Sequence, residues 1–197
     1  MPSGRGEIWF VTENRHKFLE ARAVVSGFGI SLRQLRKDKI EIQSGDLSEI
    51  AQFAAEQVSR KQDCSIVVED SGLFIEALHG FPGPFSSYVC STIGAEGILR
   101  LIAGARKRKA YFQASLALSR SKNRTRIFTG RVHGRIGFKE RGSRGFGFDP
   151  IFIPEGSNMT FSEMGTESKN NYSHRAVAFR RLAKWYLSSG LMTSSRG

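Results

Sequence analysis

The segment Ile66-Val67-Val68-Glu69-Asp70-Ser71-Gly72 places two adjacent carboxylates at the end of a short apolar run. β-Branched residues that end near a glycine are typical of a buried strand that runs into a turn. Two acids at such a point are costly to desolvate unless a cation, hydrogen bonds or a proton compensates them. In a chain with a formal net charge of +12, a divalent metal is one candidate for that positive partner.

Whether the two acids can serve one site depends on where this strand ends. Successive residues of a strand face opposite sides, so Glu69 and Asp70 face one cleft together only if the strand stops there. Ser71 and Gly72 favour such an ending. Glu41 is a further acid in an apolar setting, although the exposed face of a strand would explain it as well.

Helical and strand patterns alternate along the first part of the sequence. We expect strands at 8–11, within 30–35 or 40–42, and at 65–69, with helices from Asn14 to about 26 and from 47 to 60. Short helices between 85 and 103, a strand pair at 110–118 and 126–136, and a final helix at 176–187 follow. This order predicts an α/β fold with a mixed sheet.

The length of 197 residues suits one domain with a substantial core. We expect a folded region at 7–189 with flexible tails at 1–6 and 190–197. No apolar run is long enough to cross a bilayer, and residues 1–6 do not form an export signal. The two cysteines, Cys64 and Cys90, show no pairing pattern, which favours thiols in a reducing cytoplasm.

Basic residues outnumber acidic ones by 30 to 18, and many of them cluster between 106 and 144. A solvated basic face explains such a cluster, and so does contact with a polyanion such as a nucleic acid or a phosphorylated substrate. No zinc-finger spacing or aromatic RNA-binding motif accompanies the charge. Charge alone therefore leaves both interpretations open.

Two further segments carry groups suited to phosphate or to a base. Thr12, Asn14 and Lys17 follow the first expected strand, where the start of a helix attracts phosphate, although Asn14 is also an ordinary helix cap and the Walker pattern is missing. The segment 145–150, Gly-Phe-Gly-Phe-Asp-Pro, sets aromatic rings between glycines. Such rings offer a base a stacking surface worth roughly 1–3 kcal/mol, unless they belong to the core.

Six short motifs in order make the sequence resemble the inosine triphosphate pyrophosphatase family, from about residue 8 to 187. They are T-x-N-x-x-K at 12–17, E-D-S-G-L at 69–73, G-F-P-G-P at 80–84, G-F-G-F-D-P-I-F at 145–152, T-F-S-E-M at 160–164 and K-N-x-x-S-H-R at 169–175. Each motif is modest, but six in this order are specific. The resemblance implies an elongated α/β fold of two lobes around a cleft, with a central mixed sheet flanked by helices, and a homodimer.

The resemblance also implies a reaction. Purine nucleoside triphosphates produced by deamination (ITP, dITP and XTP) would be hydrolysed between the α- and β-phosphates, giving a monophosphate and pyrophosphate, with Mg²⁺ as cofactor. Glu41 and Glu69 match the metal-binding acids, and Asp70 matches the general base. Phosphate contacts are implied for Thr12, Asn14, Lys17 and Lys169. Phe148 matches the aromatic that stacks on the base, and the implied substrate-binding set is completed by Ser71, Phe146, Asp149, Ser173, His174 and Arg175.

The sequence departs from the family pattern at the phosphate loop, where His16 replaces the common glycine before the lysine. Residues 55–57, Ala-Glu-Gln, also lack a lysine that many relatives carry. These departures and the basic surplus leave room for an alternative, a nucleic-acid-binding protein on the same fold with weak or lost hydrolysis. A pyrophosphatase for modified pyrimidines is a closer alternative that the purine-type motifs disfavour. No membrane partner is expected.

Overall fold

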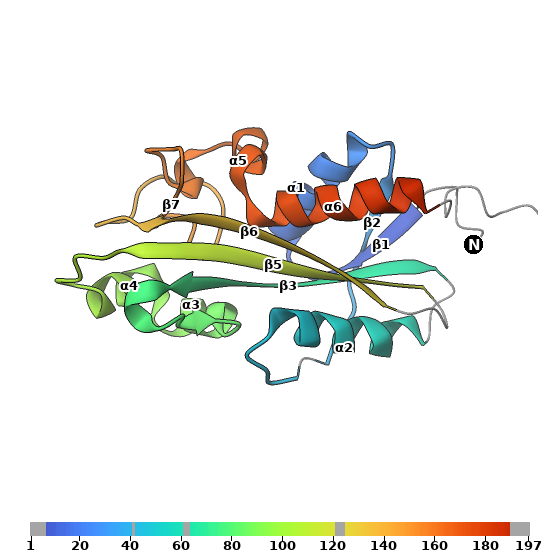
Figure 1. Ribbon diagram of the computed structural model, residues 1–197, viewed down its shortest axis with the longest axis horizontal. Helices are drawn as coiled ribbons and strands as arrows, with labels where there is room; N and C mark the ends of the chain where they lie inside the picture. The colour runs from blue at the N-terminus through green and yellow to red at the C-terminus, as the bar shows by residue number, and fades with distance from the viewer. Residues whose placement is uncertain (1–6, 41, 61–63, 121–124, 190–197) are drawn as a thin grey trace, which may run out of the picture. The chain divides into compact units, whose positions relative to one another are not determined.

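The computed structural model describes residues 7–40, 42–60, 64–120 and 125–189. The tails expected at 1–6 and 190–197, and Glu41, lie outside the described residues. Seven strands form one mixed sheet in the order β2-β1-β3-β5-β6-β7, with β4 paired to β3 (Figure 1). β1 pairs in parallel with both β2 and β3, whereas β4 and β7 pair antiparallel with β3 and β6. The mixed α/β fold predicted from the sequence is confirmed.

The strands and helices follow the predicted order closely. The strands are β1 Glu7–Val11, β2 Ser31–Leu35, β3 Ser65–Ile75, β4 Pro82–Gly83, β5 Lys109–Arg120, β6 Arg126–Ile136 and β7 Phe152–Pro154. The helices are α1 Arg15–Ser26, α2 Leu47–Ser59, α3 Ser86–Thr92, α4 Gly94–Leu101, α5 Thr166–Tyr172 and α6 His174–Ser188. The second strand therefore lies in the first of the two segments considered, and the short strands β4 and β7 were not predicted.

The chain divides into two compact units, and the boundary falls within the three longest strands. Unit 1 comprises 1–70, 115–130 and 175–197, and unit 2 comprises 71–114 and 131–174. Each of β3, β5 and β6 therefore contributes residues to both units. The elongated shape and the cleft implied by the family resemblance stay predictions.

Unit 1 is a sheet covered by helices on both faces. Ala51, Ala54 and Val58 of α2 pack with Ile66 and Val68 of β3 in one buried cluster. On the other face α6 contributes Phe179, whose ring meets that of Phe10 edge to face at 5.3 Å between centroids. Figure 1 shows α2 on one side of the strands and α1 and α6 on the other. Helices can pack on both faces of the sheet because successive residues of each strand point to opposite faces.

The core of unit 2 is built around aromatic rings. Phe112 of β5 packs against Phe152 and Phe161, with centroid distances of 4.8 and 6.1 Å. Ile98 of α4 and Val89 of α3 belong to the same buried cluster. Rings of this size bury a large apolar area and hold unit 2 together.

The predicted end of β3 is wrong, because the strand continues through Asp70 and Ser71 to Ile75. Gly72 is a point of close backbone approach, not a turn. A Cβ atom built there would lie 2.1 Å from the carbonyl oxygen of Gly83, since β4 pairs with β3 at Leu73 and Phe74. In a continuous strand Glu69 and Asp70 point to opposite faces, so the two acids do not act as one pair.

One member of the basic cluster is explained by the fold. The guanidinium of Arg108 donates to the carbonyl oxygens of Ile136, Ile102 and Gly137 at 3.0, 3.0 and 2.7 Å, and it stacks on Phe138. Burial lowers the pKa of Arg108. This side chain joins the end of α4 to the sheet, so its charge is structural and unsuited to binding a polyanion.

Glu163 makes the stability of unit 2 sensitive to acid. Its carboxylate accepts from the backbone N–H of Thr160 at 2.7 Å and lies 3.4 Å from Arg141, and the first of these contacts is the main cause of its lowered pKa. Because the pKa of Glu163 is lowered in the folded state, the ionised carboxylate stabilises the fold. This contribution is fully present at pH values above the ordinary pKa of 4.5, and it is lost as the pH falls through the folded-state pKa. We expect Glu163→Gln to flatten the acid limb of a urea-unfolding series between pH 3 and 6. An unchanged acid limb would contradict this assignment.

Candidate functional site

The loop after β1 is shaped by its own polar side chains. The Oδ1 atom of Asn14 accepts from the backbone N–H groups of His16 and Lys17 at 2.9 and 3.2 Å, which makes Asn14 the N-cap of α1 as predicted. The hydroxyl of Thr12 accepts from the N–H of Asn14 at 3.1 Å. The side-chain amide of Gln34 donates to the carbonyl of Thr12 at 2.9 Å, a contact that no sequence motif indicates. These hydrogen bonds define the conformation of the loop.

A buried ion cluster lies beside this loop in unit 1. The Nε and Nη2 atoms of Arg175 donate to the two carboxylate oxygens of Glu69, each at 2.7 Å, and Nη1 donates to Glu20 at 2.5 Å. The exposed fractions are 1% for Arg175, 2% for Glu69 and 5% for Glu20. The Nζ atom of Lys17 lies 3.6 Å from Glu69. Four charged groups thus converge where β3, α1 and α6 meet.

Burial and charge act against each other on the two cations. Burial lowers the pKa of Lys17. The negative charges of Glu69 and Asp70 act to raise this pKa, whereas the positive charges of Arg175 and Lys39 act to lower it further. For Arg175 burial acts in the same direction, but the charges of Glu69 and Glu20 outweigh it and raise the pKa. Arg175 is therefore a permanent cation, while the ammonium of Lys17 sits among acids and competing positive charges. Since both acids act on Lys17, Asp70 lies within electrostatic reach of the cluster.

Among the described residues, no three or more His, Cys, Asp or Glu gather as a ready-made metal cage. Magnesium does not require one, because it commonly binds through one or two carboxylates together with phosphate oxygens and water. Each oxygen of Glu69 accepts one hydrogen bond from Arg175, and each keeps a second lone pair that a metal can use. Glu41 lies outside the described residues.

In unit 2 the loop 145–149 closes around the carboxylate of Asp149. The Oδ2 atom accepts from the N–H of Phe146 at 2.9 Å and from the Nζ of Lys169 at 2.6 Å. Gly145 has a φ of +78°, and a Cβ there would lie 2.2 Å from that same oxygen. Only glycine allows this approach. Lys169 also lies 5.0 Å from the centroid of the Phe146 ring, so Asp149 and Lys169 together fix the loop.

The two rings of this loop have different environments. Phe148 is 2% exposed and belongs to the core of unit 2, whereas Phe146 is half-buried. A base needs an open ring face, so the expected stacking role of Phe148 does not agree with its position. Phe146 is the better candidate. The alternation of glycine and phenylalanine could not distinguish the rings, because only the fold decides which of them turns inward.

The remaining residues of the predicted site are largely buried. Ser173 and His174 are 0% and 4% exposed, and the imidazole of His174 stacks on Phe112 with centroids 4.8 Å apart. Ser71 is half-buried in β3. The structure thus brings Lys17, Glu69 and Arg175 together in unit 1, where Asp70 follows Glu69 along β3, and it brings Phe146, Asp149 and Lys169 together in unit 2. Each group belongs to its own unit.

Glu20 is the charged residue that sequence reasoning missed. It lies three residues after Lys17, on the buried side of α1 with Ala21, Val24 and Val25. Residues three apart on a helix are neighbours on its surface. An acid within that apolar stripe was therefore a usable signal for a buried charge partner.

Comparison with known proteins agrees with this description. The family model described as the Ham1 family matches residues 8–185. A dITP/XTP pyrophosphatase of Hyperthermus butylicus is 47% identical over 178 residues, covering 90% of this chain and 93% of that protein. A protein of the same name from Thermococcus kodakarensis is 48% identical over 176 residues, covering 89% and 95%.

Solved structures give the same result. The Ham1 protein of Staphylococcus aureus matches with a TM-score of 0.80 at 25% identity, covering 93% of this chain and 99% of that one. A HAM1 protein from Coxiella burnetii matches with a TM-score of 0.81 at 27% identity, covering 92% and 98%. The TM-scores show that this chain has the α/β fold of these Ham1 proteins. The chain belongs to the Ham1 family.

Proposed function

We propose that this protein hydrolyses purine nucleoside triphosphates that arise by deamination, namely ITP, dITP and XTP, to the monophosphate and pyrophosphate. The observation that carries this proposal is identity of 44–48% to several proteins named dITP/XTP pyrophosphatase over about nine-tenths of the chain. The likeness includes nearly the whole folded region, so a shared reaction is the simplest explanation. It would remove damaged purines from the nucleotide pool.

Asp70 is the proposed general base. Its carboxylate would take a proton from a water molecule as that oxygen attacks the α-phosphorus. The bond from the α-phosphorus to the bridging oxygen then breaks, and pyrophosphate leaves with the electron pair. A half-buried position suits this role, because water must reach the carboxylate while the protein still orients it.

Phosphate binding is proposed for the loop after β1. Lys17 supplies a positive charge there, and Thr12 and Asn14 supply polar groups that are already ordered. Glu69 holds Arg175 and attracts Lys17. We therefore infer that Glu69 positions these cations, and that Glu20 helps to orient the guanidinium that the family resemblance assigns to the base.

Recognition of the base is proposed for the loop 145–149 and the start of α6. Phe146 would stack on the purine, with Asp149 and Lys169 holding the loop. A 6-oxo purine presents a hydrogen-bond acceptor at the position where adenine presents a donor. A protein donor such as His174 would therefore pair with the 6-oxo purine, but it would find no acceptor on adenine. An unpaired buried donor costs about 1–3 kcal/mol, which favours ITP over ATP.

Magnesium is the proposed cofactor, and Glu41 and Glu69 are the acids that the family resemblance assigns to it. Bound there with the substrate, it would neutralise negative charge on the departing pyrophosphate. A homodimer and a cytoplasmic location also stay predictions. In the described residues no helix has the length and apolar character needed to cross a membrane.

The two rings of the loop 145–149 give a sharp prediction. Phe146→Ala should raise KM for dITP by about tenfold, since a lost stacking contact is worth roughly 1–3 kcal/mol. Phe148→Ala should instead lower the free energy of unfolding by about 3–5 kcal/mol, because it opens a cavity in the core. Steady-state kinetics and urea unfolding of both variants separate these effects. A reversal of the two results would restore the stacking role to Phe148.

The proposed reaction is tested by one panel of nucleoside triphosphates, assayed with and without Mg²⁺ for pyrophosphate and for orthophosphate. We expect pyrophosphate from ITP, dITP and XTP, much slower turnover of ATP, and loss of activity on chelation. Release of orthophosphate, or equal turnover of ATP, would contradict the proposal. Strongly salt-dependent binding of DNA or RNA without any hydrolysis would favour the nucleic-acid-binding alternative.

A further inference from the structure

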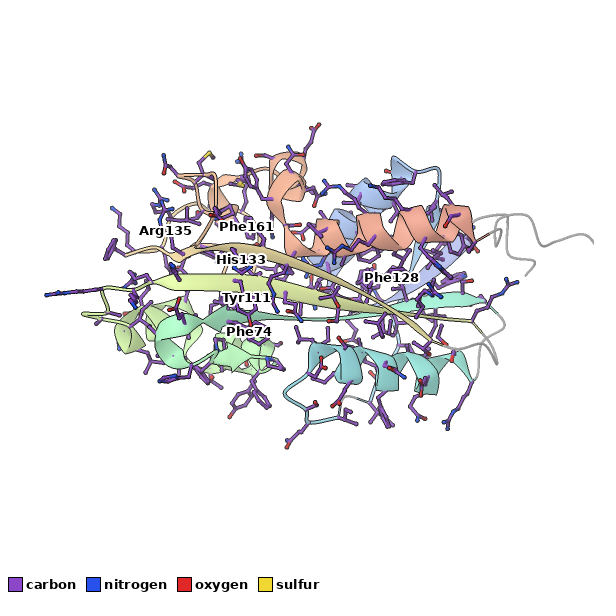
Figure 2. The ribbon with its side chains drawn as sticks, viewed as in Figure 1. Phe74, Tyr111, Phe128, His133, Arg135 and Phe161 are labelled. Carbon is purple, nitrogen blue, oxygen red and sulfur yellow. The ribbon has the colours of Figure 1, made fainter. Side chains whose placement is uncertain are left out.

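One end of unit 2, where β5 begins and β6 ends, is strongly basic. The segments 101–114 and 131–144 carry four and five Lys or Arg residues, against one acid, Glu140. They meet where the N–H of Ile136 donates to the carbonyl of Arg108 at 2.9 Å. Figure 2 shows Arg135 toward this end of β6, with His133 further back along the strand. The function proposed above makes no use of these cations.

Much of this charge is open to a partner. Within the part of the chain that the structure describes, four exposed cations of these segments make no ion pair: Arg106, Lys107, Lys109 and Lys139. Glu140 is also exposed, but its single charge does not balance theirs. Arg141, by contrast, lies 3.4 Å from Glu163. A surplus of unpaired positive charge attracts polyanions.

The same end of unit 2 presents an exposed aromatic ring. Phe138, which precedes Lys139, is 86% exposed. The guanidinium of Arg108 lies 4.7 Å from the centroid of the ring and covers one of its faces, and the high exposure leaves the other face open to solvent. Because three backbone carbonyls hold this guanidinium, the ring rests on a support that the fold keeps in place.

The combination of this ring with the cations indicates the kind of partner. A single exposed apolar side chain is common on protein surfaces, so Phe138 alone would indicate none. Single-stranded nucleic acid is bound through aromatic rings on which its bases stack and through cations that follow its phosphates. A base stacked on the open face of Phe138 would bring its phosphates near Lys139 and Lys107, the residues that follow Phe138 and precede Arg108.

Two other polyanionic partners fit less well. In a duplex the bases already stack on one another, so they offer the ring no free face. An anionic membrane would gain little from one ring, because even a single myristoyl chain, which is far larger, gives only marginal membrane binding.

We propose that this basic end of unit 2 binds single-stranded nucleic acid. A base stacks on Phe138, and the four exposed cations contact the phosphates on either side of it. This site is additional to the one proposed for dITP, and the two share no residue. Nucleic-acid binding and hydrolysis are therefore separate properties of the chain, and each can be lost without the other.

The test is fluorescence anisotropy of the full chain with labelled oligothymidylate and oligouridylate, each titrated at several salt concentrations. Binding of either strand supports the proposal, and the comparison shows whether DNA or RNA is preferred. We expect Phe138→Ala and Phe138→Leu to weaken binding about tenfold with the same salt dependence, and Phe138→Tyr to bind like the wild type. Leucine keeps the apolar character but not the ring, so it separates stacking from simple apolar contact.

The cations are tested by the salt dependence of binding. Each phosphate contact to a single strand contributes about −0.7 to the slope of log K against log salt. Lys107→Gln should therefore reduce the slope by about that amount. Lys184→Gln, which makes the same change at an exposed position of α6, should leave it unchanged.

The two sites are separated by paired variants. Phe138→Ala should turn over dITP like the wild type, whereas Phe146→Ala should bind the oligonucleotides like the wild type. Circular dichroism checks that each variant is folded. A wild type that binds oligonucleotides but releases no pyrophosphate from dITP would overturn the catalytic proposal alone.

Four results would overturn the nucleic-acid proposal. They are a wild type that binds neither oligonucleotide at low salt, a folded Phe138→Ala that binds as tightly as the wild type, equal salt slopes for Lys107→Gln and Lys184→Gln, and binding to phosphatidylserine vesicles in place of the oligonucleotides.

Discussion

Replacing Asp70 with asparagine is expected to lower kcat for dITP by about 10³-fold. A positioned general base contributes roughly 10²–10⁴-fold to proton transfer, and an amide cannot accept that proton. The substitution is nearly isosteric at a half-buried position, so the fold should survive. Steady-state release of pyrophosphate, combined with a thermal unfolding curve, measures both parts of the prediction.

Asp38→Asn is a matched control for Asp70→Asn, because it makes the same chemical change at an exposed position. It should turn over dITP like the wild type. If folded Asp70→Asn kept nearly full activity, Asp70 would not be the base. If both variants lost activity equally, the effect would reflect overall charge and not a particular carboxylate.

The substitution Arg175→Leu is expected to lower the free energy of unfolding by about 3–5 kcal/mol. It would leave the carboxylates of Glu69 and Glu20 buried without the cation that binds both of them. Removing one member of a buried ion pair is costly because the remaining charge is desolvated and uncompensated. Urea unfolding near neutral pH measures the loss directly.

Lys184→Leu provides the control, because it removes a cation at an exposed position of the same helix and should change stability by less than about 0.5 kcal/mol. A triple variant that combines Arg175→Leu with Glu20→Gln and Glu69→Gln should recover part of the stability, since no buried charge is then left unpaired. If Arg175→Leu were as stable as Lys184→Leu, the buried cluster would not hold the helices to β3.

Local patterns predicted most helices and strands of this fold. The β-branched run before Glu69, the apolar spacing of 47–58 and the cap at Asn14 each specify their element without distant contacts. The continuation of β3 was missed, because Gly72 reads locally as a turn. Its actual role is to let the backbone of Gly83 approach, a requirement set by pairing with β4 that the residues next to it do not reveal.

The candidate site was predictable as a list of residues but not as a set of contacts. The pair Glu69–Arg175 joins positions 106 residues apart, and its partner Glu20 is an acid in an otherwise ordinary amphipathic helix. The family resemblance implies a metal-binding role for Glu69 and a base contact for Arg175, but it does not indicate that each is the other's partner. In the same way, only the packing of unit 2 distinguishes buried Phe148 from Phe146.

Hydrolysis of dITP in ¹⁸O-labelled water, followed by mass spectrometry of the products, tests the central claim most directly. Attack of water on the α-phosphorus predicts that the label enters the nucleoside monophosphate and is absent from pyrophosphate. Label in pyrophosphate or in orthophosphate, or no hydrolysis of dITP with Mg²⁺ present, would contradict the reaction proposed for this protein.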